Sequence, residues 1–174
     1  ARDFDELLRG FFDNVPRELF HFDICYVLET TKAAPPIRRQ TDIRVSLGSP
    51  EDIGRLKQLF PREGGSVFEE RLAAGQIALV CRVGETRCGM SWLNLGPEHV
   101  EHEKFCTFLF STGMSWIYDV AVSTEFQRKG CATSLLFKAF EFARARGRAG
   151  VCAYVSWNNR ASLKVFEGNG YRRV

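Results

Sequence analysis

Apolar residues recur along the chain with two different periods, and each period predicts a different type of element. Over residues 3–13 phenylalanine and leucine fall at helical spacing, which predicts an amphipathic helix. Over residues 20–29 apolar and polar positions alternate, so we expect a strand with one buried face. Two consecutive prolines within residues 32–40 predict an extended linker. We therefore separate an N-terminal extension, residues 1–40, from a main domain over residues 41–174.

The first half of the main domain combines short helices with a hairpin. A strand is expected over residues 41–47, and S-P-E-D follows, with Ser49 as N-cap, Pro50 at the first helical position and Asp52 completing a capping box. This helix should run to about residue 60, and a second short helix should span residues 67–74. Residues 76–83 and 88–95 predict a hairpin around G-E-T-R. Residues 97–112 show no clear period, and we expect a less regular insertion.

The second half alternates between the two periods. Buried strands are predicted over 115–122 and 151–157, with a loop over 123–129 and a helix over 130–146 between them, which makes a crossover unit. A last helix should begin after an asparagine cap at Asn159 and end at Gly168. The order of elements predicts a mixed α/β (α+β) fold with a central sheet and flanking helices.

Composition limits the function classes further. The chain has 174 residues, 45% of them hydrophobic, which is enough apolar material for the core of one domain. Its net charge of +3 is spread along the sequence, so nucleic acid is not an implied partner. No apolar run approaches a membrane span, and no signal-peptide pattern is present at the start. The six cysteines form no C-x-x-C pair and lie mostly in apolar runs, which favours reduced thiols in a cytoplasmic protein.

The loop before the 130–146 helix has the chemistry of an anion site. It ends at a helix N-terminus, where free amides and the helix dipole favour negative charge, and phosphate is the obvious candidate. Gly130 and Ala132 let a ligand approach the backbone, while Arg128 and Lys129 add positive charge. The stretch is too short for a P-loop and lacks the glycines of a dinucleotide fingerprint.

Two motifs in this order, A-V-S-T-E-F-Q-R-K-G-C-A and N-N-R-A-S-L-K-V-F-E-G-N-G-Y, resemble the GNAT superfamily of N-acetyltransferases over about residues 41–174. The resemblance implies acetyl-CoA as the cofactor and a GNAT-like central mixed sheet. It also implies that the last strand residues before the loop pair with the pantetheine arm, and that Asn159 and its helix, which carries Phe166, lie along the cofactor. The implied strand residues are Val120, Ala121 and Val122, and the implied pyrophosphate loop is Gln127, Arg128, Lys129, Gly130, Cys131, Ala132 and Thr133.

Proton handling is harder to assign. In the family a backbone amide polarises the thioester, here at Val120 or its neighbours, and a tyrosine in the last helix often supplies the proton, but Phe166 stands at that position. Tyr118 and Asp119 are candidate catalytic residues that strand alternation sends to opposite faces, with a structural carboxylate as the alternative for Asp119. The position of a strand-borne glutamate base matches Trp116. Tyr154 and Tyr171 are expected to be packed rings.

Two further groups invite a functional interpretation. His99 and His102 lie among glutamates in the 97–112 insertion, where a solvated loop, a metal site and a cover over the acceptor cleft are the alternatives; we predict no metal. Cys131 at a helix N-terminus could act as a nucleophile, but it occupies the variable position of the loop, so a structural role is favoured.

We therefore predict direct transfer of an acetyl group from acetyl-CoA to an amine of a small molecule or peptide. A non-catalytic acyl-CoA sensor and a protein-interaction module are the alternatives. The N-terminal extension is expected to extend the sheet, to cover the cleft or to form a homodimer contact. The chain begins at Ala1 without methionine, so we expect residues before it to have been removed or left out. Only three residues follow Tyr171, where the family usually completes a closing strand, so we expect the C-terminus to be missing or disordered.

Overall fold

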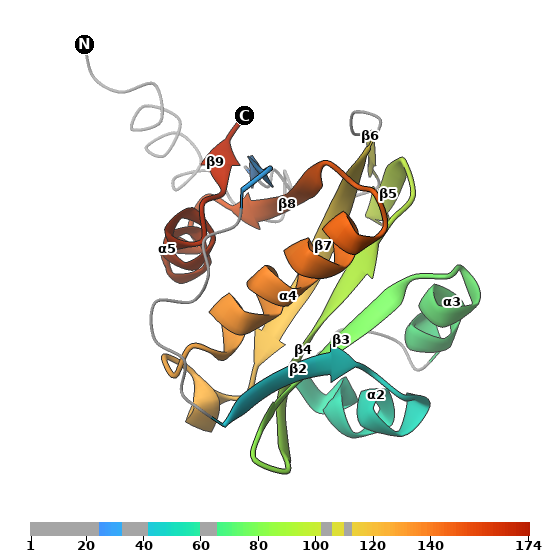
Figure 1. The fold of residues 1–174 in the computed structure, drawn as a ribbon, viewed down its shortest axis with the longest axis vertical. Helices are drawn as coiled ribbons and strands as arrows, with labels where there is room; N and C mark the ends of the chain where they lie inside the picture. The colour runs from blue at the N-terminus through green and yellow to red at the C-terminus, as the bar shows by residue number, and fades with distance from the viewer. Residues whose placement is uncertain (1–24, 33–41, 60–65, 102–105, 110–112) are drawn as a thin grey trace, which may run out of the picture.

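A seven-stranded sheet forms the centre of the protein. The computed structural model describes residues 25–32, 42–59, 66–101, 106–109 and 113–174, so the predicted helix over 3–13 and the linker lie outside the described residues. The strand order is β2-β3-β4-β7-β8-β1-β9 (Figure 1). The strands are β1 (Cys25–Thr30), β2 (Ile43–Leu47), β3 (Ile77–Val83), β4 (Thr86–Asn94), β7 (Met114–Val122), β8 (Gly150–Ser156) and β9 (Arg172–Arg173). This sheet with its flanking helices confirms the predicted mixed fold class.

The predicted crossover unit is present. Strand β7 leads through a 3₁₀ turn, Thr124–Phe126, into helix α4 (Cys131–Ala145), and the chain returns as β8. Strands β7 and β8 are parallel, whereas the other neighbours in the sheet are antiparallel. None of the helices in the described segments is long and apolar enough to cross a membrane.

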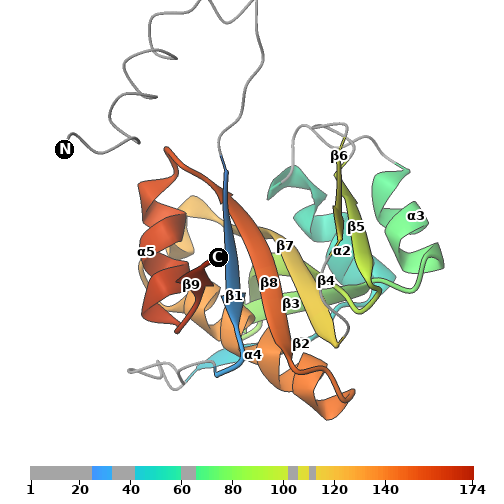
Figure 2. The same ribbon diagram turned by 90° about the horizontal axis from the view of Figure 1, so that it is seen from above.

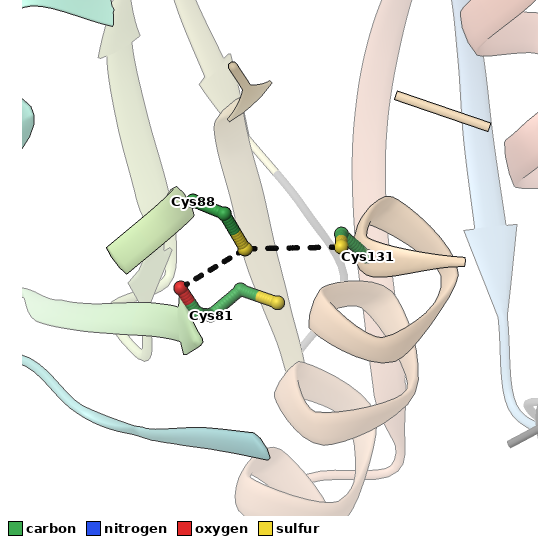
Figure 3. Close-up of side chains that lie close together, drawn as sticks. All are labelled: Cys81, Cys88 and Cys131. Carbon is green, nitrogen blue, oxygen red and sulfur yellow. Dashed lines mark hydrogen bonds between the residues drawn. The ribbon is translucent and has the colours of Figure 1, made fainter. Parts of the chain in front are cut away.

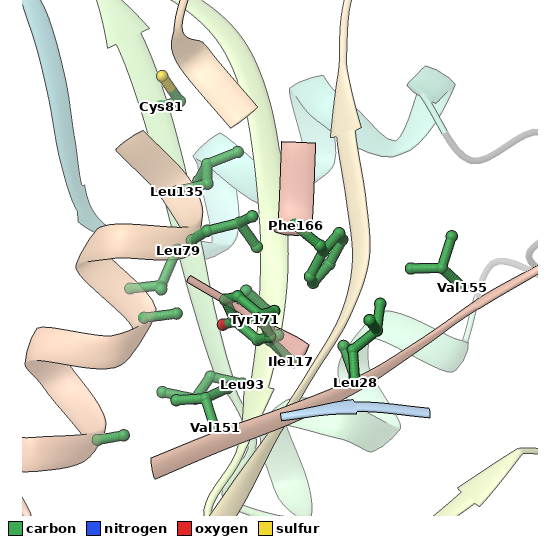
Figure 4. Packing of buried hydrophobic residues seen from close by; sticks show 14 of the residues in the cluster. Leu28, Leu79, Cys81, Leu93, Ile117, Leu135, Val151, Val155, Phe166 and Tyr171 are labelled. Atoms are coloured by element: carbon green, nitrogen blue, oxygen red, sulfur yellow. The ribbon is translucent and has the colours of Figure 1, made fainter. Parts of the chain in front are cut away.

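Helices cover both faces of the sheet. Helices α4 and α5 (Arg160–Gly168) lie on one face, and α2 (Pro50–Leu56) and α3 (Val67–Ala73) lie on the other (Figure 2). Alternation along β3 serves both sides, because Leu79 and Cys81 pack toward α4 while Ala78 and Val80 pack toward α2 and α3. Figure 4 shows the core on the α4 side, in which residues of the sheet pack against α4 and α5. The sheet therefore contributes side chains to two apolar cores, one on each of its faces.

Local sequence signals account for the helix ends. The Ser49 hydroxyl accepts a hydrogen bond from the Asp52 amide at 3.2 Å, and the Asp52 carboxylate accepts one from the Ser49 amide at 3.1 Å, which confirms the capping box. The α-helix ends at Leu56 and continues as a 3₁₀ turn to Leu59. Asn159 caps α5 through its Oδ1, which accepts from the Ser162 amide at 3.1 Å.

The 97–112 insertion is more regular than predicted. Strands β5 (Glu98–Glu101) and β6 (Cys106–Leu109) pair antiparallel as a separate two-stranded sheet. The prediction of a less regular segment is wrong for these residues, since each strand is too short to show a period of its own, and pairing with the other strand stabilises it.

Strand β1 lies inside the sheet. It pairs antiparallel with β8 over its whole length, from Cys25 opposite Ser156 to Thr30 opposite Val151, and its other edge pairs with β9. Leu28 is fully buried in the core under α4 and α5. Of the roles considered for the N-terminal extension, residues 25–30 take that of extending the sheet.

Candidate functional site

Strands β7 and β8 pair only where each begins. Within the described strands their parallel register runs from Met114 opposite Gly150 to Trp116 opposite Cys152. After that point β7 continues along β4, and β8 continues along β1. The last four residues of β7, which include the predicted Val120, Ala121 and Val122, are half-buried. The sheet therefore opens between these two strands at the end that leads into the loop.

The loop that follows β7 leads directly into the N-terminus of α4. Arg128 and Gly130 both adopt left-handed backbone conformations, with φ of 61° and 93°. The Ser134 amide donates to the Gly130 carbonyl at 2.9 Å, so the amides of the three preceding residues belong to the first turn, which has no intrahelical acceptors. These residues are Cys131, Ala132 and Thr133. Together with the helix dipole they provide donors for an anion.

The long polar side chains of the loop lie at the surface. Gln127, Arg128 and Lys129 are exposed. The Gln127 side chain donates to the Val122 carbonyl at 3.4 Å, which ties the loop to the end of β7. The Lys129 ammonium lies 4.9 Å from the centre of the Phe126 ring. Positive charge and backbone donors thus occur together at the entrance to α4.

Cys131 is the first residue of α4, but its side chain points into the core. It is 1% exposed, and its Sγ lies 3.8 Å from Sγ of Cys88 (Figure 3). Hydrogen bonds from the thiols of Cys81 and Cys88 lower the pKa of Cys131, and nearby Lys129 acts in the same direction. The buried position agrees with the structural interpretation of this cysteine and leaves its amide available to the loop.

Asn159 and Phe166, both predicted to contact the cofactor, differ in burial. Asn159 is exposed at the cap, whereas Phe166 is 5% exposed and packs edge to face on Tyr171, with ring centres 5.0 Å apart. Burial raises the pKa of the Tyr171 hydroxyl well above its usual value. Tyr171 is thus a packed ring, as predicted. The contact of Asn159 and Phe166 with a cofactor stays a prediction.

A bulge in β7 changes the orientation of the candidate catalytic residues. Met90 of β4 lies opposite Ala121, and Trp92 lies opposite Tyr118, so Ser91 faces two residues of β7. One of these is Asp119, whose φ of 49° is left-handed. The extra residue interrupts the alternation of the strand.

As a result Tyr118 and Asp119 meet the same side chain. Arg71 of α3 places Nη1 2.8 Å from Oδ2 of Asp119, and its guanidinium carbon lies 4.9 Å from the centre of the Tyr118 ring. The prediction that these two residues point to opposite faces is wrong, because a bulge shifts the pleat by one residue. The sequence carries no local signal for the bulge, and Arg71 was not among the predicted site residues.

Aromatic side chains gather on the same face, beside the β5–β6 hairpin. His99 stacks on Trp116 at 5.5 Å and lies 4.3 Å from the Tyr118 ring centre. Phe108 stacks on Trp116 at 4.9 Å and on Tyr154 at 5.3 Å. His99 is only 4% exposed, so the solvated-loop interpretation is wrong for this residue. His102 lies outside the described residues.

Comparison with known proteins agrees with this geometry. Residues 50–171 match the acetyltransferase (GNAT) family. Over 63 residues the chain is 32% identical to GCN5-related N-acetyltransferase 4, chloroplastic, from Arabidopsis thaliana; this match covers 36% of the chain and 22% of the relative.

Solved structures share the fold at low identity. A GNAT-family acetyltransferase from Novosphingobium aromaticivorans has a TM-score of 0.58 at 14% identity, over 87% of this chain and 61% of that one. A Bacillus subtilis acetyltransferase in complex with CoA has a TM-score of 0.55 at 19% identity, over 75% and 76% of the two chains. The family match spans the capping-box helix, the opened β7 and β8 strands and the helix-terminal loop. The chain therefore belongs to the acetyltransferase (GNAT) family.

Proposed function

We propose that this protein transfers an acetyl group from acetyl-CoA directly to an amine. The observation that carries the proposal is the position of the α4 N-terminus. It follows the end of β7 at which β7 and β8 no longer pair. Family membership and the CoA complex of the Bacillus subtilis relative support a CoA-type donor. The name of the Arabidopsis relative supports an amine as acceptor.

The pyrophosphate of the donor is assigned to the loop. Its phosphate oxygens would accept hydrogen bonds from the amides of Gly130 to Thr133, and the dipole of α4 would favour their negative charge. The backbone at position 130 is open, since even an added Cβ would meet only Ile43 Cδ1, at 3.7 Å. Arg128 and Lys129 add charge that attracts an anionic ligand.

The pantetheine arm is assigned to the open edge of β7. Residues 120–122 are extended strand and half-buried, and they lie on the side where β8 has diverged. An amide of this strand, at Val120 or beside it, would donate to the thioester oxygen and stabilise the charge that develops there. The amine nitrogen attacks the carbonyl carbon, the C–S bond breaks, and the thiolate takes up a proton.

Proton handling is assigned to the face shared by Tyr118 and Asp119. The Asp119 side chain is 25% exposed and paired with Arg71, so it stays accessible while its charge is partly balanced. The Tyr118 hydroxyl donates to Oε1 of Gln76 and is more deeply buried. Asp119 is therefore the better candidate for the group that accepts the amine proton.

Thiol release tests the proposal. The purified chain is incubated with acetyl-CoA and a panel of small amines and peptides, and free CoA is measured with a thiol reagent. We expect amine-dependent release with at least one acceptor, and a fall of about 10²-fold or more in Asp119→Asn if Asp119 is the base. Release that does not depend on any amine would contradict acetyl transfer.

A non-catalytic acyl-CoA sensor is the second candidate. It is favoured by Phe166, which replaces the expected tyrosine and is buried against Tyr171. Acetyl-CoA binding without thiol release on the same amine panel would support this alternative.

A further inference from the structure

Three thiols meet beneath the N-terminus of α4. Cys81 lies on β3, Cys88 on β4 and Cys131 at the start of α4. Their sulfur atoms all lie within 4.8 Å of one another, and the Cys88 and Cys131 sulfurs are 3.8 Å apart (Figure 3). All three residues are at most 1% exposed. Residues from two strands and one helix thus form one compact thiol cluster, which we call the Cys81–Cys88–Cys131 cluster.

A bulge in the β3–β4 hairpin brings two of these thiols to the same face. Cys81 lies opposite Gly89 and Arg82 lies opposite Arg87, so Cys88 has no counterpart of its own on β3. In a regular ladder Cys88 would share the face of Arg82 and point away from Cys81. The bulge turns its side chain to the face covered by α4, where Cys81 already points.

The spacing of the sulfurs suits a single metal ion. Thiolate-to-zinc bonds are about 2.3 Å long, which places two sulfurs on one ion roughly 3.8 to 4.0 Å apart in tetrahedral or trigonal geometry. The Cys88–Cys131 separation already has this value, and the other pairs are within 4.8 Å. Small side-chain adjustments would therefore bring the three sulfurs to bonding distance of one ion.

We propose that Cys81, Cys88 and Cys131 bind one thiophilic metal ion of the Zn(II), Cd(II) or Cu(I) class. Thiolates are the ligands that select such ions over Mg(II) and Ca(II). On binding, each S–H bond breaks, the proton passes to solvent and a sulfur–metal bond forms, so no electron is transferred. Three thiolates complete a trigonal site for Cu(I) and leave one position open on a tetrahedral ion.

The position of Cys131 favours negative charge on one of the three sulfurs. Cys131 begins a 15-residue helix, whose N-terminal end carries partial positive charge. Cys152 is also buried but lies in the core on the opposite side of the sheet, and it is not part of the described metal-competent group.

Metal titration of the full chain tests this site. The reduced, chelator-treated protein is titrated with Cd²⁺ without oxygen, and bound metal is followed by sulfur-to-cadmium charge-transfer absorption and by elemental analysis. We expect one Cd²⁺ per chain. Competition with Zn²⁺ and with Cu(I) then shows which ion of the class the site prefers. Metal content is measured independently of acetyl transfer.

Matched cysteine variants locate the ion. Cys88→Ala and Cys131→Ala should each weaken Cd²⁺ binding by about 10²-fold or more, since each removes a direct ligand and loss of a supporting residue alone costs roughly 10–100-fold. Cys152→Ala, with a buried thiol outside the cluster, should bind Cd²⁺ as the wild type does. Two variants from different elements are used so that one that fails to fold, as judged by circular dichroism, leaves the other decisive. A folded wild type that binds no Cd²⁺, or binding unchanged in a folded Cys88→Ala or Cys131→Ala chain, would overturn the proposal.

Discussion

Arg71 of α3 and Asp119 of β7 form an ion pair, with Nη1 2.8 Å from Oδ2, although 48 positions separate them in the sequence. The arginine also lies over the rings of Phe68 and Trp92 at 5.8 and 5.4 Å. The pair is partly buried, with side chains 18% and 25% exposed. It links the helix that covers the sheet to the bulge that precedes the proposed cofactor strand.

The Arg71–Asp119 pair should show measurable coupling. We expect a double-mutant cycle of Arg71→Met and Asp119→Asn to give about 1 kcal/mol of coupling in the free energy of unfolding, between the values typical of exposed and of buried pairs. Asparagine tolerates the left-handed backbone at position 119, so the backbone is not strained further.

Urea denaturation measures the four chains of the cycle. The exposed Glu51–Arg55 pair, at 3.1 Å with side chains 64% and 65% exposed, is the matched control and should couple by only about 0.3 kcal/mol. Additive effects of Arg71→Met and Asp119→Asn would show that the ion pair contributes nothing.

Leu28 should contribute as much to the free energy of unfolding as a core residue of the family domain does. Its side chain is fully buried in the core under α4 and α5, on the strand between β8 and β9, so Leu28→Ala is expected to cost about 3 kcal/mol through lost apolar contacts and the cavity that remains. Leu47→Ala, at a side chain 55% exposed, should change the free energy of unfolding by less than about 0.5 kcal/mol. Thermal and urea unfolding provide the values. A Leu28→Ala chain as stable as Leu47→Ala would contradict the position of β1 in the sheet.

Gly150 allows β8 and β1 to approach each other. A Cβ at this position would collide with the Thr30 carbonyl oxygen and would meet Met114 Cε at 2.9 Å. Gly150→Ala should therefore destabilise the fold by about 2 kcal/mol or more, since the obstacle is partly backbone. Gly168→Ala, where a Cβ meets nothing within 4 Å at the end of α5, should be neutral or stabilising by up to about 1 kcal/mol. Equal melting temperatures for the two variants would contradict this prediction.

Asp52 should make the free energy of unfolding fall as the pH is lowered into the acid range. Burial raises the pKa of its carboxyl, but hydrogen bonds from Arg87, the Ser49 amide and Arg82 outweigh this, and the folded pKa lies well below the ordinary 3.8. A depressed folded pKa contributes stability above the unfolded value, and this contribution is lost as the pH falls from about 5 through 3.8 toward the folded pKa.

Asp52→Asn tests this dependence. At pH 7 it should cost about 2 kcal/mol, less than the roughly 3–5 kcal/mol for a fully buried pair, since both arginines keep some exposure. The gap between wild type and variant should narrow below about pH 4. Glu51→Gln, at a side chain 64% exposed, should change stability by less than about 0.5 kcal/mol at pH 7. A gap that stays constant down to pH 2 would contradict the assignment to Asp52.

The features predicted correctly depend on neighbours in sequence. The Ser49–Asp52 capping box, the Asn159 cap and helix α4 are determined by residues a few positions apart, and their patterns were sufficient. The parallel pairing of β7 with β8 followed from the crossover between them.

The features that were missed depend on contacts between distant segments. The bulge at Asp119 requires β4 as a partner, and the thiol cluster requires β3, β4 and α4 together. Residues 25–29 of the predicted strand lie in β1, but Val27 packs against the second core, so the prediction of a single buried face is wrong. The place of β1 between β8 and β9 is a choice among sheet edges that its own residues do not encode. Arg71 lies on a short helix whose sequence gives no indication that one side chain reaches β7.

Calorimetric titration of acetyl-CoA tests the proposed cofactor site most directly. Gly130→Asp would place a side chain and a negative charge where the pyrophosphate is assigned. Gly147→Asp is the matched control, because Gly147 also has positive φ, at 76°, and lies in open space at the other end of α4. We predict micromolar binding by the wild type and by Gly147→Asp, and binding weaker by about tenfold or more, at least 1.4 kcal/mol, in Gly130→Asp. Binding that is absent in the folded wild type, or equal in Gly130→Asp and wild type, would contradict a cofactor site at the N-terminus of α4.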